Sequence, residues 1–175
     1  MGEYWLNLED VPEEGKEYHL AEPTIWSEPL EEFDLPYAMQ NPLQAELFIL
    51  PQEKGCLVRG RFWGSVSLPC DRCAEAYEFL VDAGFEIFEE LQPSSKLEQE
   101  LGPTFLRQEA EVFFLDVGGI LWEQFLLALP VKQVCSSSCA GLCPYCGQNL
   151  NKNLCSCEPP PPDPRLEVFR KLKIE

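Results

Sequence analysis

Cysteine is the residue that most restricts how this chain can fold. Five of its nine cysteines fall within residues 139–157, in the stretch CAGLCPYCGQNLNKNLCSC. A segment so dense in thiols holds too few apolar side chains for a core of its own, so disulfides or a metal must shape it. The first residues, MGEYWLNLED, show no basic leader and no apolar run. We therefore expect a cytoplasmic protein, whose reduced thiols favour metal binding.

The C-x-x-C pair at Cys143 and Cys146 is typical of a metal-binding knuckle. The tight turn of a knuckle points backbone N–H groups at the sulfurs, and Gly147, directly after the pair, can take the positive φ that this turn needs. Cys155 and Cys157 follow after eight residues and complete a set of four thiolates. A closed set of four suits structural zinc rather than catalytic zinc.

Two alternatives for this set stay open at the sequence level. Iron–sulfur ligation could use the same residues, although nothing else in the sequence indicates redox chemistry, so zinc is favoured. In an extended strand Cys155 and Cys157 would point the same way, because they are two residues apart. One of them could then ligate while Cys139 completes the set.

A second C-x-x-C pair, Cys70 and Cys73, lies in LPCDRCAEAY, between two predicted strands. A metal there needs two more ligands, and Cys135 and Cys139 are free to supply them. Cys56 then remains as a buried thiol of the preceding strand. The alternatives are a hairpin with incidental thiols and a thioredoxin-like redox pair. The redox pair is disfavoured because its C-x-x-C should open a helix after a strand.

Three neighbouring stretches alternate apolar and polar residues, as half-buried strands do. They are LQAELFIL, CLVRGRFWGSVSL and AYEFLVDAGFEIFEE, at residues 43–50, 56–68 and 76–90. Their short connections predict an antiparallel meander. Gly60 and Gly64 lie on the inner face of the second strand and predict a bulge or tight bend, which would curl the sheet towards a barrel.

The flanking segments complete an α+β fold. We expect a short strand and an irregular wrapping segment over residues 1–40, an exposed acidic loop over 92–110, and a fourth strand over 111–115. Asp116 can cap a helix from Val117 to Ala128, and this helix is apolar nearly all round, so we expect it to be buried against the sheet.

These patterns divide the chain into three parts. We predict a mixed α+β domain with an antiparallel sheet over residues 1–130 and a zinc-ribbon-like, metal-binding cysteine module over 131–158. Residues 159–175 hold a stiff proline spacer, EPPPPDP in part, and then a basic helix that starts at Asp163 and Pro164.

Charge limits the classes of partner. The net charge is −17, and residues 1–34 carry eleven acids and one base. Residues 131–175 are mildly basic, with six bases and four acids. An acidic body is poorly suited to nucleic-acid phosphates and better suited to a basic protein. The plainer interpretation is that acidity keeps the protein in solution.

No pattern in the sequence indicates an enzyme. The one histidine, His19, lies in an acidic stretch far from the cysteines, and there is no phosphate-binding glycine loop or nucleophile motif. Sets of four thiolates leave no open position for a catalytic water. The most apolar window, residues 112–129, contains acids and glycines and is too short to span a bilayer. We expect no catalytic residues, small-molecule substrate or membrane partner.

Four stretches taken in order resemble the YceD family, the large ribosomal RNA subunit accumulation proteins. They are LPCDRCAEAYE, LDVGGILWEQFLLALP, CSSSCAGLCPYCGQNLNKNLCSC and DPRLEVFRKLK, and the likeness covers roughly residues 40–175. It implies a bacterial cytoplasmic protein needed for normal accumulation of 23S ribosomal RNA, with no known enzymatic activity. It also favours one site for Cys70, Cys73, Cys135 and Cys139. The full second cysteine set and the acidic N-terminal region depart from part of the family.

Three functions compete on this basis. The leading hypothesis is a non-catalytic ribosome biogenesis factor with two structural zinc ions, whose acidic body meets a large-subunit ribosomal protein or pre-ribosomal particle. The second is a zinc-ribbon protein that contacts RNA directly through the basic residues of its C-terminal end, Lys152, Arg165, Arg170, Lys171 and Lys173. The third is a thiol redox enzyme that uses Cys70 and Cys73. The expected metal ligands are Cys70, Cys73, Cys135, Cys139, Cys143, Cys146, Cys155 and Cys157.

Overall fold

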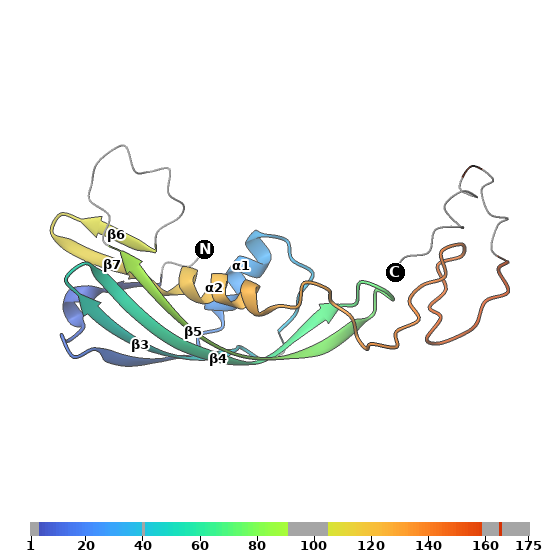
Figure 1. The fold of residues 1–175 in the computed structure, drawn as a ribbon, viewed down its shortest axis with the longest axis horizontal. Coiled ribbons are helices and arrows are strands. Elements are labelled where there is room, and N and C mark those ends of the chain that lie inside the picture. The colour runs from blue at the N-terminus through green and yellow to red at the C-terminus, as the bar shows by residue number, and fades with distance from the viewer. Residues whose placement is uncertain (1–3, 40, 91–104, 159–164, 166–175) are drawn as a thin grey trace.

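The computed structural model describes residues 4–39, 41–90, 105–158 and 165. Two antiparallel sheets and two helices form the body, and a cysteine-rich segment extends from one end of it (Figure 1). In chain order the elements are β1 (Trp5–Asn7), the 3-10 turn η1 (Leu8–Asp10), β2 (Lys16–Leu20), α1 (Thr24–Glu32), β3 (Gln44–Gln52), β4 (Gly55–Pro69), β5 (Ala76–Glu90), β6 (Leu106–Glu109), β7 (Val112–Asp116) and α2 (Val117–Ala128).

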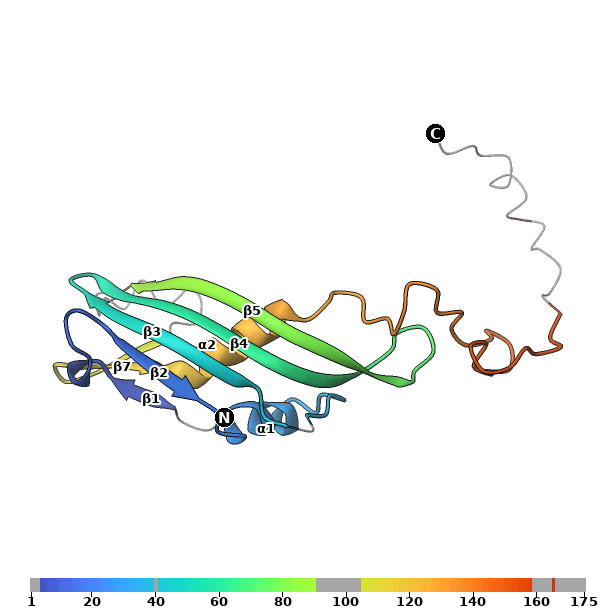
Figure 2. The same cartoon turned by 90° about the horizontal axis from the view of Figure 1, so that it is seen from below.

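The larger sheet has the order β2-β3-β4-β5, so the predicted meander is confirmed and gains one strand. β4 and β5 pair without interruption from Gly55 opposite Glu90 to Pro69 opposite Ala76. The predicted bulge is therefore wrong. The strands curve along their length, but the sheet stays open, with β2 and β5 at its edges, and it does not close into a barrel (Figure 2).

Gly60 serves packing rather than a bulge. A Cβ at this position would lie 2.4 Å from the Phe85 ring and 2.5 Å from the Leu47 side chain. Because such distances are far inside van der Waals contact, only glycine lets these two side chains meet over β4. The glycine thus permits dense packing on the curved face of the sheet.

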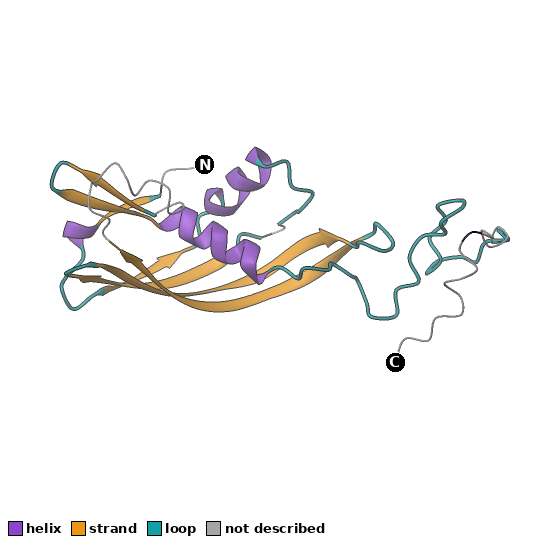
Figure 3. Ribbon diagram, turned by 45° about the horizontal axis from the view of Figure 1, so that its top comes forward, coloured by secondary structure: helices purple, strands orange, loops and turns teal. Residues whose placement is uncertain are grey.

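Both helices lie on the same side of the larger sheet (Figure 3). The predicted helix is confirmed as α2, and its cap is the predicted one, because Asp116 accepts a hydrogen bond from the Gly119 N–H at 2.9 Å. Trp26 of α1 joins the layers, since its ring centroid lies 5.9 Å from those of both Phe62 on β4 and Phe125 on α2. Burial of these aromatic rings is a large part of what holds the helices on the sheet.

The described residues of the N-terminal region, 4–39, are more regular than the sequence suggested. They contain β1, β2 and α1, and α1 buries Ile25, Trp26 and Leu30. The expected short strand is confirmed as β1, whereas the expectation that an irregular wrapping segment follows it is wrong. α1 is only nine residues long and holds Pro29 in its interior, where proline removes a helical hydrogen bond, so packing on the core must stabilise this helix.

The predicted loop at residues 92–110 is corrected in part. Residues 106–109 form β6, which pairs with β7 in the smaller sheet β1-β7-β6. A strand of four residues has no signal of its own and depends on its partner strand. Residues 91–104 and the predicted spacer and helix of 159–175, Arg165 excepted, lie outside the described residues. None of the described helices is long and apolar enough to cross a membrane.

Candidate metal centres

The ribbon of β4 and β5 ends in a tight turn that carries the first cysteine pair. Here Ala74 donates its N–H to the Cys70 carbonyl at 2.8 Å, and Cys70 donates its own to the Glu75 carbonyl at 2.9 Å. Ala74 takes a φ of 58°, in the left-handed region. The turn places both thiols on one side of the ribbon's tip, where Cys70 is 2% and Cys73 3% exposed.

The segment after α2 is bound across this tip. Gln133 and Asp71 exchange two hydrogen bonds of 2.7 Å, one to the Gln133 carbonyl and one to the Asp71 carboxylate. Arg72 donates to the Ser137 carbonyl at 3.2 Å and to the Cys139 carbonyl at 3.0 Å. These contacts bring the second pair of thiols over the first.

The four sulfurs that meet here form what we call the hairpin quartet, consisting of Cys70, Cys73, Cys135 and Cys139. All lie within 4.8 Å of one another. The Cys70–Cys139 distance is 3.9 Å and the Cys73–Cys135 distance is 3.8 Å. A disulfide would need about 2.05 Å. Zinc–sulfur bonds of about 2.3 Å in a tetrahedron put sulfurs about 3.8 Å apart, so the spacing fits zinc.

The second knuckle repeats the hydrogen bonds of the first. Gly147 donates its N–H to the Cys143 carbonyl at 2.9 Å, and Cys143 donates to the Gln148 carbonyl at 2.8 Å. Gly147 has a φ of 74°, so the positive φ predicted for this residue is confirmed. Two separate parts of the chain thus fold into the same turn around a C-x-x-C pair.

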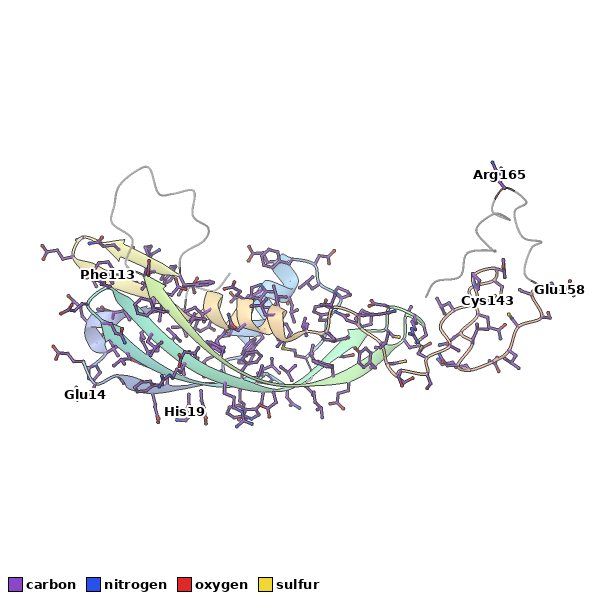
Figure 4. All side chains as sticks on the ribbon, viewed as in Figure 1. Glu14, His19, Phe113, Cys143, Glu158 and Arg165 are labelled. Carbon is purple, nitrogen blue, oxygen red and sulfur yellow. The ribbon has the colours of Figure 1, made fainter. Side chains whose placement is uncertain are left out.

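The tail quartet consists of Cys143, Cys146, Cys155 and Cys157, whose sulfurs also lie within 4.8 Å of one another. The structure groups the Cys139 sulfur with the hairpin quartet, so it does not place Cys139 in the position of Cys155 or Cys157. Cys143 is 5% exposed, whereas Cys146 and Cys157 are exposed. The tail quartet lies beyond the end of the sheet, where Figure 4 labels Cys143. Both quartets offer the donor set of structural zinc.

Both quartets contain thiols whose pKa is lowered, and at Cys139 burial is outweighed by hydrogen bonds from Asn151 and the Gly141 N–H. At Cys70 burial opposes the thiolate, but N–H groups of Cys135, Cys73 and Arg72 aim at the sulfur and prevail, lowering the pKa to about 6. At Cys143 the N–H groups of Cys146 and Tyr145 lower the pKa to about 6. Hydrogen bonds to the charged form are the common cause. These backbone groups would likewise stabilise a metal-bound thiolate.

Other thiols of the quartets hold their protons firmly. The Cys139 thiol and burial raise the pKa of Cys135 to about 12, and the Cys146 thiol and burial raise the pKa of Cys157 to about 12. Four sulfurs this close cannot all be negative without a cation between them. Since metals bind thiolates, an ion entering either quartet would displace these protons.

The structure separates the remaining candidates. Of the basic residues predicted to contact RNA, Lys152 forms an ion pair with Glu75 at 2.7 Å, and Arg165 is exposed. The other three, Arg170, Lys171 and Lys173, lie outside the described residues. His19 is on the outer face of the larger sheet, far from Cys143 (Figure 4). Its Nδ1 lies 3.4 Å from the Glu46 Oε1.

Sequence reasoning missed the polar residues that hold the quartets in place. Arg72 and Gln133 join the two halves of the hairpin quartet, and Asn151 donates to the Cys139 sulfur at 3.3 Å. The sequence offered a signal for Arg72, since this residue lies between the two cysteines of a knuckle. Gln133 and Asn151 had none, because their partners are distant in the sequence.

Both quartets lie in the part of the chain that matches a known family. The model of the family described as "Large ribosomal RNA subunit accumulation protein YceD" matches residues 58–173. This chain belongs to the YceD family. The resemblance seen in the sequence is thereby confirmed, although the YceD match begins within β4, whereas the resemblance was traced from about residue 40.

A curated YceD relative supports the assignment. It is the large ribosomal RNA subunit accumulation protein YCED homolog 1, chloroplastic, of Arabidopsis thaliana, which is 23% identical over 145 residues. The match covers 69% of this chain and 45% of the relative, so the chain spans less than half of that relative's length. No solved structure matches the chain.

Proposed function

We propose that this chain is a non-catalytic ribosome biogenesis factor that supports accumulation of 23S ribosomal RNA. The family match over residues 58–173 carries the proposal, because the family and the Arabidopsis relative are both named for accumulation of the large ribosomal RNA subunit. The proposal includes action in a bacterial cytoplasm, where reduced thiols stay free to bind metal.

Two structural zinc ions form the second part of the proposal. Four sulfurs at distances that fit tetrahedral zinc support it at the hairpin quartet, and a matching knuckle supports it at the tail quartet. Four thiolates fill the shell of zinc and leave no place for a water, which favours a role in shape over catalysis. Iron would use the same ligands and is the less favoured ion.

The proposed partner is a basic large-subunit protein or a precursor particle that contains one. Residues 1–34 carry eleven acids and one base, and this acidity suits a basic protein surface better than bare RNA. Of the five basic residues considered for RNA contact, Lys152 is engaged with Glu75 within the protein.

Depletion of the protein in its source cell tests the proposal. We expect mature 23S ribosomal RNA and large subunits to fall on sucrose gradients, while the small-subunit RNA is spared. Re-expression of the wild-type chain should restore both, and a Cys70→Ser/Cys73→Ser chain should restore neither. Unchanged 23S levels after depletion would contradict the proposed function.

Two measurements on purified protein separate the competing functions. A metal count should give two zinc equivalents per chain, and thiols that react only after chelation are ligands rather than redox catalysts. Binding of purified RNA that weakens steeply with salt, with a slope that flattens when basic residues are neutralised, would favour direct RNA contact instead.

A further inference from the structure

The side chain of Asn151 connects the two quartets. Its Nδ2 donates to the Cys139 sulfur of the hairpin quartet at 3.3 Å and to the Asn149 Oδ1 at 2.9 Å. Its Oδ1 accepts the Ala140 N–H at 2.8 Å. An amide nitrogen cannot accept that N–H, so this bond fixes the orientation in which Nδ2 faces the sulfur.

Asn151 belongs to the loop that the tail quartet closes. The loop lies between Cys146 and Cys155, which are both members of the tail quartet. Within it, Leu150 donates to the Gly141 carbonyl at 2.9 Å, and Asn151 donates its own N–H to the Asn149 side chain at 3.0 Å. An ion in the tail quartet would tie both ends of this loop together, and the loop would then hold Asn151 over the other quartet.

The same loop and the residues just before Cys143 also bind the hairpin turn directly. Lys152 forms an ion pair of 2.7 Å with Glu75, which is two residues after Cys73. Leu142 donates its N–H to the Arg72 carbonyl at 2.9 Å. Gly141 makes this approach possible, because a Cβ there would lie 3.0 Å from that carbonyl oxygen and its φ is 75°. The two quartets are therefore packed as one unit.

We propose that Asn151 is a positioning residue for the ion of the hairpin quartet, supplied by the loop of the tail quartet, so that loss of the tail ion weakens retention of the hairpin ion. This inference rests on the proposed zinc sites and adds a linkage between them. Hydrogen-bond donors to a ligating group orient it, and their loss costs about 10–100-fold in metal affinity. The contact is made by the Asn151 donor, which reaches a hairpin ligand from the tail loop. Because linkage between two binding sites is reciprocal, the hairpin ion should favour retention of the tail ion by the same factor.

The test follows each quartet separately in the zinc-loaded full chain. Limited chelator is added, and the thiols are alkylated over time. Mass spectrometry then compares the rate of alkylation of the hairpin pair, Cys70 and Cys73, with that of the tail pair, Cys143 and Cys146. For Asn151→Leu, which keeps the size but removes both the Nδ2 donor and the Oδ1 acceptor of the amide, we expect the hairpin pair to be alkylated about 10-fold faster than in the parent. Asn151→Asp should have a larger effect, because a carboxylate faces the thiolate.

Asn153 is the matched control. It lies two residues further along the same loop, it is exposed, and Asn153→Leu should leave the alkylation of the hairpin pair unchanged. A second variant removes the tail ion instead, by Cys155→Ser/Cys157→Ser, and should also speed alkylation of the hairpin pair about 10-fold. Far-UV circular dichroism checks that the sheet stays folded in every variant.

The outcomes separate the linkage from the function. A parent with two zinc ions, together with Asn151→Leu and Cys155→Ser/Cys157→Ser chains whose hairpin thiols stay as protected as the parent's, would overturn the linkage alone. A parent that binds no zinc would overturn the linkage and the zinc sites together. The effect of depletion on 23S RNA is read in cells and is independent of both results.

Discussion

The two quartets use the same turn but owe their positions to different forces. The hairpin quartet lies at the tip of a 15-residue strand pair, and its first two cysteines are almost fully buried. The tail quartet lies within residues 143–157 beside exposed side chains such as Tyr145 and Leu154. A packed sheet presents the first pair of thiols whether or not an ion is bound. The tail has little apolar burial, so the ion itself must supply most of its folding energy.

Removal of the metal should produce the largest difference in stability between the two regions. After chelation we expect residues 140–157 to lose protection from hydrogen exchange, because a structural zinc contributes on the order of 10 kcal/mol to a small module. The β3–β4–β5 region should keep its protection. Readdition of zinc is the control and should restore the tail. A tail that stays equally protected without metal would show that the two regions are stabilised alike.

A substitution in the core should have the reverse effect. Trp26→Ala removes a ring packed on Phe62 and Phe125 and should destabilise the sheet by about 3–5 kcal/mol in denaturant unfolding followed by circular dichroism. The native variant should still bind two zinc ions. Trp63→Ala is the control, because Trp63 is only partly buried and lies beside Arg61 on the opposite face. A loss of zinc from native Trp26→Ala protein would mean that the core and the quartets are not separable.

The smallest expected effect is on zinc affinity, and it comes from the residue with positive φ in each of the two turns. Gly147→Ala should cost about 1 kcal/mol, or about 5-fold in zinc affinity at the tail quartet, since its φ of 74° disfavours a side chain. A Cβ there meets nothing within 4 Å, so the cost is purely conformational. Ala74→Gly should tighten the hairpin quartet by a similar factor, because Ala74 already has a φ of 58°. Competition with a zinc indicator measures both, and equal affinities in all three proteins would contradict the argument.

The long strands, the capped helix and the division of the cysteines could be predicted from the sequence. Alternation over 76–90 and an Asp before an apolar run are local signals. The distribution of eight thiols between two sets followed from counting ligands and from family resemblance, and the structure brings those thiols together in those sets. Their role as ligands stays a prediction.

What the sequence could not predict depends on tertiary contacts. α1 contains Pro29, which argues against a helix locally, and packing of Trp26 overrides that signal. β6 exists only through its pairing with β7. Asn151 is one of several asparagines in a polar stretch, and only the fold shows which one reaches a sulfur.

Cys56 lies apart from the other eight thiols, and it can serve as a probe for opening of the larger sheet. It is 0% exposed on β4, and burial raises its pKa to about 11. Alkylating reagents and oxidants attack the thiolate, so the Cys56 thiol does not react while the sheet stays folded. In a sample freed of metal, the reaction rate of Cys56 should report how often strands β3, β4 and β5 separate, because only that opening exposes its sulfur.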